Sequence, residues 1–106
     1  MAWLYLVLAG IMEVAWAIGM KQSEGFTKLI PSLWTLGLMV VSFLLLSQAV
    51  RVLPIGTSYA IWTGIGAVGT AIVGILVYNE PRDFVRIGFI SLILIGIIGL
   101  KWVEKA

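Results

Sequence analysis

The chain has 106 residues, of which 61% are hydrophobic and 11% are charged, with a formal net charge of +2. A soluble domain of this length could not bury so much apolar surface, so the composition excludes a soluble globular protein and predicts an integral membrane protein. The sequence has no cysteine and no histidine. Disulfides, thiolate ligands and imidazole chemistry are therefore excluded, and we expect no metal site, no cofactor and no enzymatic activity.

The first apolar block covers residues 2–20 and contains a single acid, Glu13. Its Ala15-Trp16-Ala17 stretch imitates a signal-peptide cleavage site. However, residues 1–3 carry no Lys or Arg, and the apolar block contains Glu13. Both features are atypical of a secretory signal peptide, so we expect a retained membrane helix.

Three further apolar blocks follow, at residues 32–49, 55–77 and 85–100. Each is about as long as a helix needs to cross a hydrocarbon core of roughly 30 Å. Pro31 and Pro54 stand before the second and third blocks, where a missing N–H costs little. We therefore predict an all-α membrane protein, with residues 1–106 forming one domain of four transmembrane helices.

The third block is rich in glycine, with the sequence "GIGAVGTAIVG" at residues 64–74. Small residues let membrane helices approach closely, so tight packing is one interpretation. The pair Gly64 and Gly66 is also a candidate bend point. In a transporter, such a bend is where a gate would move.

Basic residues flank the blocks at both predicted ends of the helix bundle. One end holds Lys21, Lys28, Arg82 and Arg86, and the other holds Arg51, Lys101 and Lys105. An excess of Lys and Arg on the cytoplasmic side normally sets the orientation, and here the excess is a single residue. The balance favours insertion in both orientations. The alternative, which stays open, is a single orientation that is set because some basic positions influence insertion more than others.

Glu13 is the only ionisable residue deep inside any of the four blocks. A charged acid near the membrane centre is costly, and no Lys or Arg lies at a comparable depth to neutralise it. One interpretation is a permanently protonated acid that hydrogen-bonds a neighbouring helix. The interpretation that we favour is a binding site for a cation from outside the chain. Because withdrawal from water favours the neutral carboxyl, the acid would take a proton when the cation leaves.

Helical spacing places a small and an aromatic residue beside this acid. Gly10 and Trp16 lie three residues to either side of Glu13, on the same helical face. Membrane cores accept tryptophan less readily than leucine, so we assign Trp16 to the wall of the site, although a role as apolar filler stays open.

Polar and aromatic residues of the other blocks are candidates to complete the site. Tyr59 and Trp62 share a face of the third block, and their polar groups need partners, for which Glu13 is the expected choice. Ser42, alone in the middle of the second block, either joins this network or bonds back to a carbonyl of its own helix.

Four short helices are too few to enclose a water-accessible path and shield it on both sides. A second copy would supply the rest and bring two Glu13 side chains together, each favouring protonation of the other. With the balanced loop charges, the economical arrangement is an antiparallel homodimer. Such a pair reproduces the inverted repeats of larger transporters, with the substrate site at the midplane.

Three motifs give the chain a resemblance to a known family. They are "AGIMEVAWAIGMKQSEGFTKLIP" at residues 9–31, "LPIGTSYAIWTGIGAVGTAIVG" at residues 53–74, and Glu80-Pro81. Over essentially its whole length the chain resembles the small multidrug resistance family of four-helix proton-coupled exporters. The resemblance implies an antiparallel, dual-topology homodimer in the bacterial inner membrane, with Glu13 as the shared proton and substrate site.

Within the family, the combination of Glu13, Trp16 and Ser42 resembles the guanidinium-exporter subtype. Exporters of polyaromatic drugs usually carry small residues where Trp16 stands. By position, Tyr59 and Trp62 match the aromatic and hydrogen-bonding residues that line the family's site.

Two glycines of this chain match small residues of the family. By position, Gly10 matches the small residue beside the acid. Members often have two glycines seven residues apart at the dimer contact of the fourth helix. Gly96 matches the second of these, while Phe89 stands where the first would be.

The expected function is proton-coupled export of guanidinium and small mono-substituted guanidinium ions by alternating access. The first alternative is proton-coupled export of quaternary ammonium or polyaromatic cations. The second alternative is a role as one subunit of a heterodimer with a related chain. The expected partners are cations, protons, the lipid bilayer and a second copy of the chain, and no nucleic acid.

Overall fold

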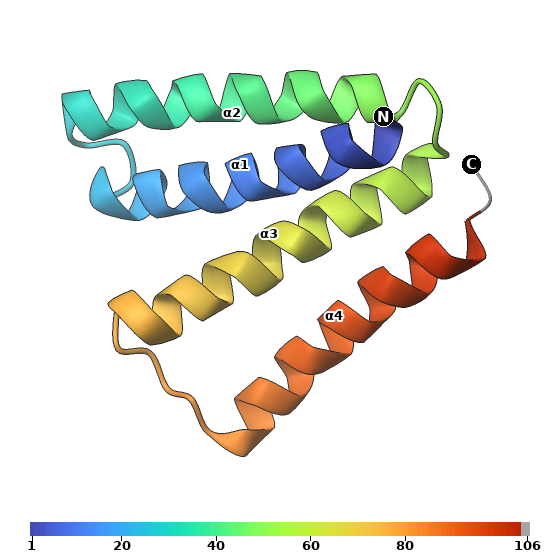
Figure 1. Cartoon of the computed structure of the whole chain (residues 1–106). Coiled ribbons are helices and arrows are strands. Elements are labelled where there is room, and N and C mark those ends of the chain that lie inside the picture. The colour runs from blue at the N-terminus through green and yellow to red at the C-terminus, as the bar shows by residue number, and fades with distance from the viewer. Residues whose placement is uncertain (105–106) are drawn as a thin grey trace.

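In the computed structural model, which describes residues 1–104, the chain folds into helices joined by short loops (Figure 1). The four helices are α1 (Ala2–Gln22), α2 (Leu29–Ala49), α3 (Ile55–Val77) and α4 (Phe84–Val103). All four are long and apolar enough to cross a membrane. The all-helical class and the four membrane-spanning segments are confirmed. Lys105, counted above among the loop charges, lies outside the described residues.

The predicted bounds hold for α3, whereas the other three helices are longer than expected. The largest change is in α2, which begins at Leu29, so that Pro31 is its third residue and does not precede it. The interpretation of Pro31 as a residue before the helix was wrong. The first-turn N–H groups of a helix have no intrahelical acceptor, so proline is tolerated there.

The helices lie side by side in the order α2, α1, α3, α4, with α1 packed against both α2 and α3 (Figure 1). The N-terminus, the α2–α3 loop and the end of α4 share one end of the molecule, and the other two loops share the opposite end. At the first end, the Lys101 ammonium lies 4.9 Å from the Trp3 ring centroid, and the Thr57 hydroxyl donates to the Glu104 carboxylate at 3.3 Å. The described basic residues therefore divide between the two ends as the order of the blocks predicts.

The buried core lies among α1, α2 and α3, and α4 contributes no buried residue. Within residues 1–104, α4 packs mainly against α3, and its Lys101 also reaches the Trp3 ring of α1. At this contact the Ile97 side chain lies against Gly64, in space that a Cβ on Gly64 would occupy. Most of the apolar surface of α4 is therefore left uncovered by its own chain.

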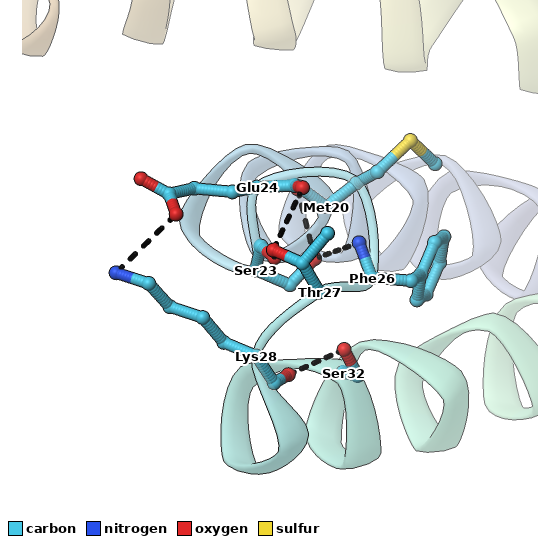
Figure 2. Close-up of polar contacts among 7 residues, drawn as sticks. All are labelled: Met20, Ser23, Glu24, Phe26, Thr27, Lys28 and Ser32. Atoms are coloured by element: carbon cyan, nitrogen blue, oxygen red, sulfur yellow. Dashed lines mark hydrogen bonds and ion pairs between the residues drawn. The ribbon is translucent and has the colours of Figure 1, made fainter.

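The loop from α1 to α2 is a tight turn with unusual backbone angles. Residues 24–26 have φ values of 53°, 73° and 69°, a left-handed conformation that costs free energy for residues other than glycine. Side chains of the loop offset this cost (Figure 2). The Ser23 hydroxyl donates to the Met20 carbonyl and accepts from the Phe26 N–H, each at 2.9 Å, while the Thr27 hydroxyl donates to the Ser23 carbonyl at 3.0 Å. The loop thereby holds α1 and α2 antiparallel.

Candidate functional site

A cavity of about 490 Å³ lies between α1 and α3. Glu13 and Trp16 line it in the middle of α1, and Gly66 lines it in α3. It continues along both helices to Lys21 and to Glu80, at the end of the molecule that carries the α1–α2 and α3–α4 loops. The cavity therefore connects the intramembrane acid to one end of the helix bundle.

The inner end of the cavity depends on the missing side chain of Gly66. The Glu13 carboxylate occupies the space where a Cβ on Gly66 would stand. Two further close approaches bring α1 and α3 together: Gly10 faces Ile65, and Gly69 faces Val14. These contacts are what the close-packing interpretation of the glycines predicts.

A bend at Gly64 and Gly66 stays a prediction. In this structure α3 runs as one helix from Ile55 to Val77. Both glycines are buried and each faces a side chain of another helix, Gly64 on the α4 side and Gly66 on the α1 side.

Two polar atoms in this region are buried without a hydrogen-bond partner among the described residues. They are Oε1 of Glu13 and Nε1 of Trp16. Buried polar atoms are nearly always paired, and an unpaired one costs the full free energy of its lost hydration. A buried acceptor and a buried donor, three residues apart on one helical face, therefore lack a partner within the described part of the chain.

Ser42 and Trp62 form a buried network one helical turn away from the acid. The Trp62 indole N–H donates to the Ser42 hydroxyl at 3.0 Å and lies 3.2 Å from the Ala9 carbonyl, and the Ser42 hydroxyl donates to the same carbonyl at 2.8 Å. The expectation that Glu13 receives the indole N–H was wrong. Ala9 lies four residues before Glu13 and is small, so α2 and α3 both approach its carbonyl.

The same network decides between the two interpretations of Ser42. Its hydroxyl bonds a carbonyl of α1 and not one of its own helix. Ser42 therefore holds α2 against α1 and at the same time accepts the Trp62 N–H from α3.

Aromatic rings form a row beside the network. The Phe43 centroid lies 6.5 Å from that of Trp16 and 5.6 Å from that of Trp62, and the Tyr59 centroid lies 5.5 Å from that of Trp62. Trp62 is 6% exposed, whereas Tyr59 is 57% exposed. Tyr59 and Trp62 thus meet through their rings, but neither lines the cavity that holds Glu13.

Gly96 lies on α4, and no atom falls within 4 Å of where its Cβ would be. A role in a dimer contact is therefore not tested within a single chain and stays a prediction.

Several cavity residues were missed by the analysis of the sequence. Thr63 and Thr70 place hydroxyl-bearing side chains along its α3 wall, and Lys21, Tyr78 and Glu80 surround its outer end. The spacing of the threonines, seven residues apart on one face of α3, was a readable signal. The position of Glu80 was not, because it depends on how the loop after α3 folds back.

Known proteins resemble this chain over almost its whole length. The family described as Small Multidrug Resistance protein matches residues 1–103. The chain is 57% identical over 101 residues to a protein of Yersinia pestis named "Guanidinium exporter", covering 95% of this chain and 97% of that protein. Proteins of the same name from Citrobacter freundii and Proteus vulgaris are 54% and 52% identical, each over 95% of this chain and 96% and 97% of their own lengths.

Proposed function

Because the chain belongs to the small multidrug resistance family, we propose that it exports guanidinium and small mono-substituted guanidinium ions in exchange for protons. It is a multi-pass protein of the bacterial inner membrane, since it has four apolar helices and its relatives are bacterial exporters. The relatives named as guanidinium exporters support the choice of cargo.

The observation that carries the proposal is the unpaired Oε1 of Glu13 beside the cavity. A guanidinium ion is planar, keeps its charge at physiological pH and presents N–H groups that match a carboxylate in pairs. The cavity would admit such an ion from one end of the bundle to this acid. The ring of Trp16, which also lines the cavity, offers a face to a flat cation.

Coupling follows from competition for one group. A carboxylate that holds the cation has no proton, and a carboxyl that holds a proton has no charge to attract the cation. Proton entry from outside the cell therefore releases the cargo, and cargo binding from the cytoplasm releases protons. Ser42 and Trp62 would serve this cycle by fixing how α1, α2 and α3 pack around Glu13, and Tyr59 by bordering Trp62.

The working unit in this proposal is an antiparallel homodimer. Two features support it: the apolar surface of α4, including Gly96, is uncovered in the single chain, and the loop charges are nearly balanced. A partner inserted in the opposite sense would bring a second Glu13 to the midplane. Alternating access is then an exchange of shapes between the two subunits, with Gly64 and Gly66 as the proposed bend.

The size of the cavity favours a second candidate, export of bulkier quaternary ammonium or polyaromatic cations. At about 490 Å³ the cavity in one chain is far larger than a guanidinium ion needs. This alternative makes no use of hydrogen bonding by the cargo, because a tetraalkylammonium ion has no N–H to donate. It is therefore separable from the main proposal by experiment.

The test is electrical recording on proteoliposomes that contain only the purified chain. We expect proton-gradient-dependent currents with guanidinium and none with tetraethylammonium. Currents with tetraethylammonium alone would overturn the main proposal in favour of the bulky-cation exporter. Absence of current with both cations, and its appearance on addition of a related chain, would point to the heterodimer.

A further inference from the structure

Glu80 is folded back onto the outer end of the Glu13 cavity. Asn79 has a φ of 55°, and this left-handed residue reverses the chain directly after α3. The Glu80 N–H then donates to the Gly74 carbonyl at 3.1 Å. Its carboxylate lies against Gly74, in space that a Cβ there would fill. The turn and the glycine together hold a carboxylate on the rim of the cavity.

This placement puts an exposed carboxylate at the C-terminal end of α3, where a cation is favoured. The last carbonyls of α3 point toward the same region and carry partial negative charge, which disfavours an acid and favours a cation. The ion pairs among residues 1–104 are Lys28–Glu24 and Arg86–Asp83, and neither includes Glu80. Lys21, the ammonium on the same rim, lies over the Tyr78 ring at 5.9 Å from its centroid.

The cavity therefore has a carboxylate at each end. Glu13 rests on Gly66 and Glu80 rests on Gly74. These glycines are eight residues apart on α3, which corresponds to about 12 Å along the helix. Thr70 lines the wall between them. At the inner end, Glu13 Oε1 and Trp16 Nε1 are buried and have no hydrogen-bond partner among the described residues.

We infer that Glu80 is a second, outer binding residue for the guanidinium-type cation, which it captures at the mouth of the cavity and passes inward to Glu13. The inference rests on the function proposed above. A guanidinium group bonds the Glu80 carboxylate through two N–H groups, which a tetraalkylammonium ion lacks. Lys21 opposes capture, since its positive charge lies on the same rim. In an antiparallel dimer, each side of the membrane has one such mouth.

The experiment measures the guanidinium concentration that gives half-maximal current in proteoliposomes, for the wild type and for Glu80→Gln. We expect this concentration to rise about three- to tenfold in E80Q at low salt, with the saturating current retained. The rise should shrink as salt is added, because screening weakens attraction at the mouth. Glu24→Gln is the matched control: it removes the same charge from the same end of the molecule, but from the loop outside the cavity.

Lys21→Gln provides an independent second variant, for which we expect a lower half-saturating concentration. A half-saturating concentration in E80Q equal to that of wild type or of E24Q would overturn the inference. Failure of the proposed function has a different signature, because the wild-type chain itself would then give no guanidinium current.

Discussion

The carboxylate of Glu13 lies directly on the backbone of Gly66, so that the proposed cation-binding residue of α1 is positioned by a missing side chain in α3. The contact joins two residues separated by fifty-three positions in the sequence. It leaves one carboxylate oxygen buried and unpaired beside the cavity.

Gly66→Ala should therefore abolish guanidinium transport while the protein still assembles. The added methyl group takes the space of the Glu13 carboxylate, which must rotate away from its position in the cavity. Guanidinium-driven currents in proteoliposomes measure the effect. Gly56→Ala is the control, since it lies in the same helix and a Cβ there meets nothing within 4 Å. Wild-type currents in G66A would contradict this account of how Glu13 is positioned.

Glu13→Gln should remove proton-coupled transport completely. A glutamine amide neither exchanges a proton in the physiological range nor carries a charge to attract the cation. The measurement is uptake of guanidinium driven by a pH gradient, with size-exclusion chromatography to establish that the variant assembles. Gradient-driven uptake that persists in E13Q would refute competition for one acid as the coupling mechanism.

Trp16→Gly should widen the range of transported cations toward larger substituted guanidinium ions. The substitution removes one wall of the cavity and the ring that lies tilted beside Phe43. Currents for a series of increasingly bulky substituted guanidinium ions give the comparison. Trp102→Gly is the control, because Trp102 is 86% exposed at the end of α4. The same selectivity in W16G as in wild type would exclude Trp16 from the cavity wall in the working protein.

Ser42→Ala should destabilise the fold by about 1–3 kcal/mol, because it removes the acceptor of the Trp62 N–H and leaves a buried polar group poorly satisfied. Unfolding of the purified protein in detergent, followed by tryptophan fluorescence, measures the loss. Ser47→Ala is matched to it: Ser47 lies on the same helix, but its exposed hydroxyl bonds a carbonyl of its own helix, that of Leu44. Equal stabilities of S42A and S47A would show that the buried network contributes little.

Insertion in both orientations predicts that every loop is accessible from both sides of the membrane. The chain has no cysteine, so single substitutions Glu24→Cys and Val52→Cys report the two ends of the bundle. In sealed vesicles, an impermeant thiol reagent should label about half of the molecules of each variant. Full labelling of one variant with none of the other would establish a single orientation.

Much of the fold could be read from the sequence because membrane-spanning length and apolar composition are local properties. The bounds of α3 were predicted correctly, since Pro54 marks its start and the polar Asn79-Glu80-Pro81 follows its end. The start of α2 was not, because a proline is equally acceptable just before a helix and within its first turn.

The composition of the site was only partly predictable. Glu13 stands out because an acid inside an apolar membrane helix is costly and marks a candidate functional site. Helical spacing then places Trp16 on the same face as Glu13. The partner of Trp62 depends on the relative register of α1 and α3, which no local pattern encodes. Phe43 lies among many apolar residues of α2 and carries no signal that separates it from them.

The hydrogen bonds that shape the α1–α2 turn all come from within residues 19–32. All residues that form this helical hairpin are therefore outside the ribosome once residue 50 has emerged, before α3 and α4 emerge. We expect the translocation machinery to receive the first two helices as one preformed unit, on which the later ones are assembled.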